Sequence, residues 1–96
     1  MTITMQTDHE GTYVFITADG EKIPRGFTPE TDRYQVAKFL ALLNEHEQEI
    51  TEMTGEYRDK LEWNARNVGQ GKYWPIFAQT HRLLDRLQKR AGIVDS

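Results

Sequence analysis

The sequence predicts an α+β fold: a small N-terminal antiparallel β-hairpin or meander, then a long helix, straight or bent, and then a shorter antiparallel helix. Two observations predict this fold. Residues 12–18 are dense in β-branched and aromatic side chains and run into the turn dipeptide Asp19-Gly20. Apolar residues recur three and four apart over 29–68 and again over 75–91, which is the period of one helix face. Strands that precede helices along the chain are typical of an α+β domain.

Residues 1–27 are predicted to form the β-meander of a single domain that spans residues 1–96. The meander is expected to be two- or three-stranded, with strands at residues 2–7 and 12–18 and a return strand at about residues 21–23. Asp19-Gly20 suits the positive φ angles of a type I′ hairpin turn, and Pro24 ends the last strand because it has no N–H to donate. A sheet this small is marginal alone and requires a helix against its apolar face.

Residues 29–68 are predicted as the long helix, which starts with Thr28 as a cap and Pro29 at a tolerated first position. Its apolar pattern has a polar gap at His46 and Glu47, and its only glycine is Gly55. Forty residues at a rise of ~1.5 Å make a rod of about 60 Å. A compact chain of this size has a radius of gyration of only ~12–13 Å. We therefore expect either a break near Gly55 or a partner that covers part of the apolar stripe.

The rest of the chain is predicted as a loop over 69–74, a second helix over 75–91 and a tail over 92–96. Pro75 suits the first position of a helix, and Gly92 suits the position just after its end. The second helix spans about 25 Å. It is too short to cover the whole stripe of the long helix.

The composition excludes several classes of protein. The chain has 96 residues, a net charge of −3 and no cysteine, which excludes a disulfide framework, thiolate chemistry and a cysteine-type zinc site. The whole-chain charge does not predict non-specific attraction to nucleic acid or to an anionic membrane. The N-terminus lacks the basic region and apolar run of a signal peptide, and no apolar stretch reaches the ~18–20 residues of a membrane span. We expect a soluble, cytoplasmic protein without a membrane partner.

Few residues are arranged for catalysis. His46 and Glu47 begin like the zinc-protease motif, but the second histidine of that motif is missing. Residues 69–72 do not fit a phosphate-binding loop, because the spacing is wrong and no Ser or Thr follows the lysine. The only serine, Ser96, lies at the end of the sequence. We therefore predict no enzyme activity, no catalytic residue, no metal, no cofactor and no small-molecule substrate.

Acidic residues form a row on the predicted outer face of the long helix. At ~100° per residue the row consists of Glu45, Glu49, Glu52, Glu56 and Asp59, with Tyr34 and Trp63 near its ends. Neighbouring like charges at this spacing destabilise a helix by a few tenths of a kcal/mol each. The row is either a solvated face or a docking surface for a basic partner.

The second helix has the opposite charge. Its region supplies the candidates for binding phosphate or acidic groups: Lys72, Arg82, Arg86 and Arg90. The three arginines are four residues apart, so they lie along one edge of the helix. The alternative is that these arginines pair with the acidic row or extend over the core.

Aromatic residues beside the interhelical loop are candidates for an interface. Tyr73 and Trp74 lie next to flexible glycines, and Tyr and Trp are enriched among interface hot spots. The alternative is a structural lid that holds the helix start against the core. Trp63 is expected to be exposed, because the helical wheel places it away from the apolar stripe. The full set of candidate partner-binding residues is Trp63, Tyr73, Trp74, Glu49, Glu52, Glu56 and Asp59.

These observations favour a non-enzymatic protein that binds another macromolecule, either a protein partner or a second copy of itself. In build alone (small, acidic, cysteine-free and without motifs) the chain is similar to accessory and inhibitor proteins that phages deploy against host nucleases and defence complexes, which is an analogy without a matching residue motif. The alternatives are a nucleic-acid-associated protein that uses the basic second helix, and a homodimeric structural protein. The choice depends on whether one chain covers its own apolar stripe.

Overall fold

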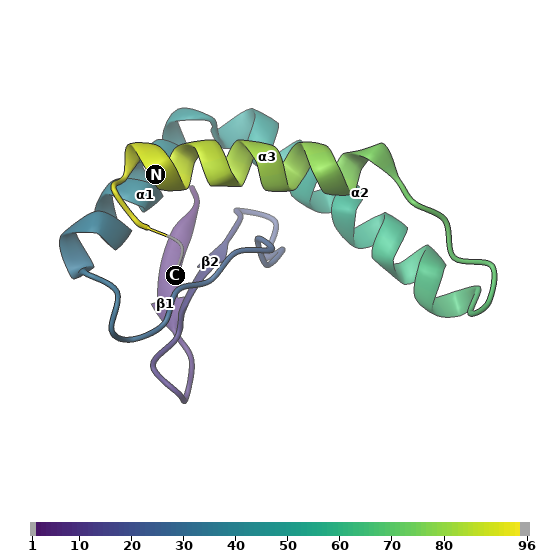
Figure 1. The fold of residues 1–96 in the computed structure, drawn as a ribbon, viewed down its shortest axis with the longest axis horizontal. Helices are drawn as coiled ribbons and strands as arrows, with labels where there is room; N and C mark the ends of the chain where they lie inside the picture. The colour runs from purple at the N-terminus through teal and green to yellow at the C-terminus, as the bar shows by residue number, and fades with distance from the viewer. Residues whose placement is uncertain (1, 95–96) are drawn as a thin grey trace.

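The fold is α+β, as the sequence predicts (Figure 1). The computed structural model describes residues 2–94. A two-stranded antiparallel hairpin precedes the helices, in the order β1 (Thr4–Thr7), β2 (Tyr13–Ile16), α1 (Arg33–Glu45), α2 (Glu47–Arg66) and α3 (Pro75–Arg90). Residues 95–96, the end of the predicted tail, lie outside the described residues. Within residues 2–94, no helix combines the length and the apolar character that crossing a membrane requires.

β1 and β2 pair in antiparallel register along their whole length. The predicted return strand at 21–23 is wrong. This part of the chain meets β2 in isolated bridges, one at Lys22 and one at Phe27. Pro24 lies between the two bridges, in a turn where the N–H of Arg25 donates to the carbonyl of Ile23 at 2.8 Å. The sheet is therefore smaller than the predicted meander.

The turn after β2 is not of type I′. Gly20 has a φ of +83°, but the φ of Asp19 is not positive, whereas a type I′ turn requires positive φ at both central residues. Instead, the N–H of Gly20 donates to the carbonyl of Thr17, and the N–H of Thr17 donates to the carbonyl of Glu21, both at 2.9 Å. The dipeptide thus predicts the place of the turn correctly and its type wrongly.

Asp8 holds the turn between β1 and β2. Its Oδ1 accepts the N–H of Glu10 at 2.8 Å and the N–H of Thr12 at 3.0 Å. Desolvation alone would raise the pKa of Asp8, but these two hydrogen bonds, with the charges of His9 and Lys22, outweigh it and lower the pKa below its usual value of 3.8. The folded turn therefore favours the charged carboxylate.

We expect this turn to lose stability in acid. A carboxylate with a depressed folded-state pKa contributes stability that is present above the unfolded-state pKa, near 3.8, and is lost as the pH falls through the folded-state pKa. Asp8→Asn should therefore lower the urea midpoint at about pH 6, and the difference from wild type should shrink towards about pH 2.5. Asp19→Asn, at another exposed turn residue, is the control and should have a smaller effect. A pH-independent effect of Asp8→Asn would contradict this assignment.

α1 begins at Arg33, not at the predicted Pro29. The N-cap is Asp32, whose carboxylate accepts the backbone N–H of Tyr34 at 2.8 Å and the N–H of Gln35 at 3.3 Å. A helix start leaves four N–H groups without partners, and a carboxylate that accepts two of them stabilises the start at this point. The hydroxyl-and-proline signal a few residues earlier is overridden by this cap.

The predicted long helix is broken, but the predicted place of the break is wrong. α1 ends at Glu45 and α2 begins at Glu47, with His46 between them at φ −113° and ψ 29°. Gly55 lies inside α2 next to the buried Thr54, so packing keeps the helix continuous there. All neighbours within two residues of His46 are polar, so a break at this gap costs little packing.

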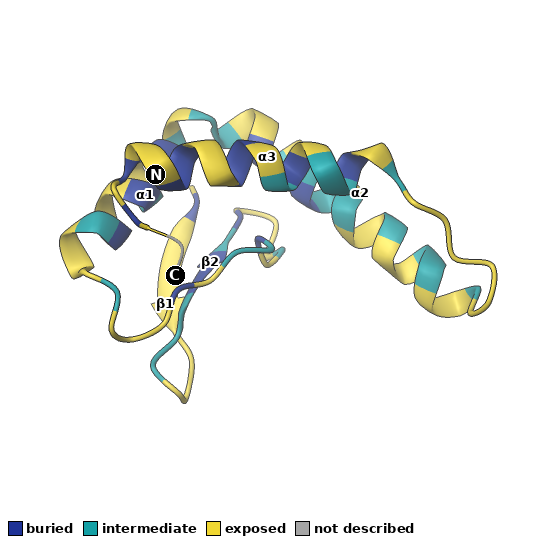
Figure 2. Ribbon diagram, in the orientation of Figure 1, coloured by how far each residue is buried: buried dark blue, intermediate teal, exposed yellow. Residues whose placement is uncertain are grey.

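The core lies between the hairpin, α1 and α3 (Figure 2). Phenylalanine rings meet at its centre, with centroids 5.9 Å apart for Phe15 and Phe27, 5.2 Å for Phe15 and Phe39, and 5.0 Å for Phe27 and Phe39. Buried aliphatic side chains surround them: Ile3, Ile23, Val36, Leu43, Leu84 and Leu87. This cluster is what joins the sheet to the helices.

Asn44 ties the N-terminal segment to α1. Its Oδ1 accepts the N–H of Ile3 at 3.0 Å, and its Nδ2 donates to the carbonyls of Ile3 and Leu40, both at 3.1 Å. The side-chain amide therefore pairs with the backbone of Ile3 as a neighbouring strand would. Ile3 is buried, so its backbone groups depend on this pairing.

The molecule is elongated, with extents of 41 × 28 × 24 Å. The break at His46 divides the predicted rod, and the 20 residues of α2 then span about 30 Å. The second half of α2 still extends beyond the β-hairpin and α1, towards the loop that joins it to α3 (Figure 1). The break thus resolves only part of the mismatch between helix length and core size.

Candidate functional site

The projecting part of the molecule is the distal hairpin, defined as residues 55–75: the second half of α2, the loop and the first residue of α3 (Figure 1). The buried residues of α2 are Ile50 and Thr54, which both precede it. Figure 2 shows no buried position in the second half of α2 or in the loop. An isolated helix of about 12 residues is marginal in water. The distal hairpin is therefore supported by contacts within it and, near its base, by the contacts of Tyr57 with Phe77 and His81 and the ion pair of Arg58 with Glu21.

Trp63 and Trp74 form a tryptophan pair that holds the distal hairpin together. Their rings meet edge to face, with centroids 5.8 Å apart and planes at 84°. The side-chain oxygen of Asn64 accepts the indole N–H of Trp74 and the backbone N–H of Lys72, both at 3.3 Å. Lysines contact the rings: Nζ of Lys60 lies 4.3 Å from the Trp74 centroid, and Nζ of Lys72 lies 5.5 Å from that of Trp63.

The expectation that Trp63 is exposed is wrong. The loop folds back, Trp74 packs against Trp63, and both residues are half-buried. This contact agrees with the alternative interpretation of Trp74 as a structural lid. Tyr73, by contrast, is 72% exposed. It is therefore the aromatic residue of the loop that is accessible to a partner.

The apolar stripe of the predicted long helix is covered only in part. Val36 and Phe39, near its start, are fully buried. Leu61 and Val68, near its end, are 48% and 85% exposed. The core of this chain therefore covers the first half of the stripe and leaves the end open. This open end makes the distal hairpin the candidate docking surface.

The acidic row is exposed, but it does not lie on one helix. Its members are Glu45, Glu49, Glu52, Glu56 and Asp59, all of them exposed. Glu45 is the last residue of α1, before the break, so the predicted continuous row is wrong at that residue. Asp59 pairs with Arg58 at 2.8 Å. Within residues 2–94, Glu52 and Glu56 make no ion pair.

The arginines of α3 do not pair with the acidic row. Arg82, Arg86 and Arg90 are exposed, and none of them makes an ion pair with any residue that the structure describes. The alternative interpretation, in which they pair across the two helices, is therefore wrong. The arginines that neutralise carboxylates at close range lie elsewhere, and they include Arg25 and Arg58.

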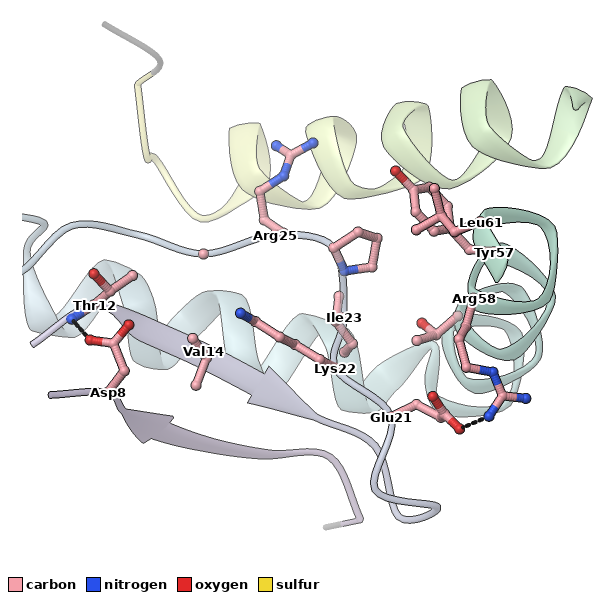
Figure 3. Close-up of a pocket in the computed structure, with 13 residues that line it drawn as sticks. Asp8, Thr12, Val14, Glu21, Lys22, Ile23, Arg25, Tyr57, Arg58 and Leu61 are labelled. Carbon is pink, nitrogen blue, oxygen red and sulfur yellow. Dashed lines mark hydrogen bonds and ion pairs between the residues drawn. The ribbon is translucent and has the colours of Figure 1, made fainter. Parts of the chain in front are cut away.

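A groove that the sequence does not predict lies between α2 and the segment after β2 (Figure 3). It has a volume of about 520 Å³. Ile23 lines it on the side of the sheet, and Tyr57 and Leu61 line it on the side of α2. Nη1 of Arg58 pairs with Glu21 across it at 2.5 Å. Its walls are far apart in the sequence, so no local pattern indicates it.

A hydrogen-bonded network joins the segment after β2 to α3. Nη2 of Arg25 lies 2.8 Å from Asp85 and 3.4 Å from Nδ1 of His81, whose Nε2 lies 2.9 Å from the hydroxyl of Tyr57. Arginine can only donate, so Nδ1 of His81 accepts, and Nε2 carries the proton and donates to Tyr57. His81 itself is half-buried. The network fixes the segment after β2 against α3.

Within residues 2–94, no group of three or more His, Cys, Asp or Glu side chains is placed to hold a metal ion. No protein-family profile, no curated protein and no solved structure matches the chain. The function therefore has to follow from the exposed surfaces themselves. Two of them stand out: the open apolar end of the distal hairpin and the unpaired arginines of α3.

Proposed function

We propose that the chain is a non-enzymatic protein-binding protein, a small accessory or inhibitor protein that docks on a protein partner through its distal hairpin. The observation that carries this proposal is the open end of the apolar stripe. Leu61 and Val68 are exposed there, and no residue in the second half of α2 is buried. Tyr73 adds an exposed aromatic side chain of the kind that anchors interfaces. A partner that covers these side chains would supply the burial that α2 lacks.

The partner should present an apolar pocket beside basic residues. Glu52 and Glu56 are exposed on α2 and have no ion-pair partner within residues 2–94. Their charges would steer a basic surface towards α2 and fix its orientation. The apolar side chains would contribute most of the affinity, at ~25 cal/mol per Å² of apolar surface buried.

Catalysis is not part of this proposal. Two of the polar residues that line the groove, Arg25 and Tyr57, are engaged, because both bond to His81. The similarity of build to phage accessory and inhibitor proteins, and the cytoplasmic location, both come from the sequence composition. The phage analogy and the cytoplasmic location are therefore part of the proposal, and their basis is the composition.

The test removes the exposed apolar side chains and leaves the core intact. The combined variant Leu61→Ser, Val68→Ser, Tyr73→Ser should lose the partner that the tagged wild-type chain captures from its native host. It should bind the purified partner at least about 30-fold more weakly, as expected for the loss of one hot spot of ~2 kcal/mol. Tyr34→Ser with Val94→Ser is the matched control, because both residues are 87% exposed and lie outside the distal hairpin.

Both variants should melt within a few degrees of the wild type, because exposed side chains contribute little to stability. Trp63 is left intact, since its replacement would break the tryptophan pair. Retained binding by the hairpin variant, or an equal loss in the control, would contradict the proposal. A solution mass of two chains would instead assign the hairpin to a second copy of the protein.

A further inference from the structure

We propose that the outer face of α3 is a separate binding surface for the phosphodiester backbone of a nucleic acid. This surface, the α3 cation row, consists of Arg82, Arg86, Lys89 and Arg90. All of them are exposed, and none makes an ion pair within residues 2–94. The row lies outside the distal hairpin and does not depend on it.

The spacing of the α3 cation row suits a charged polymer. Arg82, Arg86 and Arg90 are four residues apart, so they follow one line in steps of about 6 Å and span about 12 Å. A nucleic-acid strand carries one phosphate for each ~3.4 Å of rise, so about four phosphates pass along this length. Asp85, the one acidic residue of α3, is engaged by Arg25 at 2.8 Å. The row therefore keeps its full positive charge.

Magnitudes favour a nucleic acid over an acidic protein as the occupant. Exposed ion pairs contribute only ~0–1 kcal/mol each, whereas protein association costs at least about 4 kcal/mol in lost freedom. Apolar burial would have to offset that cost, and no large apolar residue of α3 is exposed. A nucleic acid instead releases condensed counterions for every phosphate that is neutralised. A short row of cations is then enough for salt-dependent binding.

The net charge of −3 does not oppose this binding, because the charges are segregated by helix. The acidic row lies mostly on α2, with Glu52 and Glu56 unpaired within residues 2–94. These carboxylates would repel a phosphate backbone and confine it to α3. Glu52→Gln with Glu56→Gln should therefore raise the affinity for nucleic acid.

Fluorescence anisotropy of labelled DNA tests the α3 cation row. The probes are a duplex of about 20 base pairs and a single strand of the same sequence, titrated with the full chain between about 50 and 200 mM NaCl. If all four cations contact phosphates, affinity should fall about 150-fold over this range for the duplex and about 50-fold for the single strand. The probe with the higher affinity shows whether the α3 cation row prefers duplex or single-stranded DNA.

Arg82→Gln with Arg86→Gln should reduce the salt-dependent fall for the duplex from about 150-fold to about 12-fold. The melting temperature of this double variant should stay at the wild-type value, because Arg82 and Arg86 are both exposed. Arg33→Gln with Lys38→Gln on α1 removes the same charge from other exposed positions. This control should keep the full salt dependence.

The proposal is overturned if neither probe binds at about 50 mM NaCl, if Arg82→Gln with Arg86→Gln keeps the wild-type salt dependence, or if the α1 control loses as much. Displacement of DNA by polyglutamate at equal charge would also overturn it, in favour of an acidic protein. None of these results affects the capture experiment with the distal hairpin. The two proposals therefore fail independently.

Discussion

Phe39→Ala is expected to destabilise the protein by about 3–5 kcal/mol, the largest effect that we predict for a single substitution. Phe39 is fully buried, and its ring centroid lies 5.2 Å from that of Phe15 and 5.0 Å from that of Phe27. Truncation therefore leaves a cavity where the sheet and α1 meet. A chain of this length is stable by only about 5–14 kcal/mol, so the loss is a large fraction of the total.

Urea unfolding followed by circular dichroism measures this loss. Tyr34→Ala is the control on the same helix, and it should change the free energy of unfolding by less than about 0.5 kcal/mol, because Tyr34 is 87% exposed. A loss below about 1 kcal/mol for Phe39→Ala would show that the phenylalanine rings are not the centre of the core.

Asn44→Ala is expected to destabilise the protein by about 2–3 kcal/mol, although it removes no apolar side chain. Asn44 bonds to both the N–H and the carbonyl of Ile3. Ile3 is buried, so its two backbone groups would lose their partners where water has little access, and each such loss costs about 1–3 kcal/mol. Gln48→Ala, at an exposed position on the next helix, is the control. An effect of Asn44→Ala as small as that of the control would mean that the N-terminal segment is held by its side chains alone.

The order of the elements follows from local patterns, and these are the parts that the sequence predicts well. Pro75 begins α3, and the helix ends just before Gly92, as predicted, because both residues act on the backbone next to them. The high density of β-branched and aromatic residues over 12–18 likewise predicts β2. The pairing of β2 with the segment after it is less extensive than predicted, because that segment turns at Pro24 between the two bridges.

The division of the long helix depends on competition between distant contacts, which the sequence does not reveal. The glycine signal at Gly55 has no effect, since Thr54 and Ile50 hold α2 against the rest of the fold. The polar gap at His46 decides instead, because breaking the helix there costs little apolar packing. The same reasoning applies to the N-cap of α1. Asp32 accepts two backbone N–H groups at once, and residue propensities alone do not favour Asp32 over Thr28 as the cap.

The candidate site divides in the same way. Exposure of the arginine edge and of most of the acidic row follows from the helical period, so the sequence places these charges correctly on the surface. Trp63 is misplaced because the wheel ignores the loop, which brings Trp74 onto its ring. The groove between Ile23 and Tyr57 is missed entirely, since it forms between segments that only the folded chain brings together.

The separation of the distal hairpin from the core also affects how the protein can change over generations. Large destabilising effects come mainly from substitutions at buried or networked positions, and residues 55–75 contain no buried position. Substitutions at Leu61 or Tyr73 therefore leave the folded population nearly intact and keep the chain above the stability threshold that selection enforces. Outside the tryptophan pair, and outside Tyr57 and Arg58, which bond to the rest of the fold, mutational drift is then limited mainly by what the hairpin contacts.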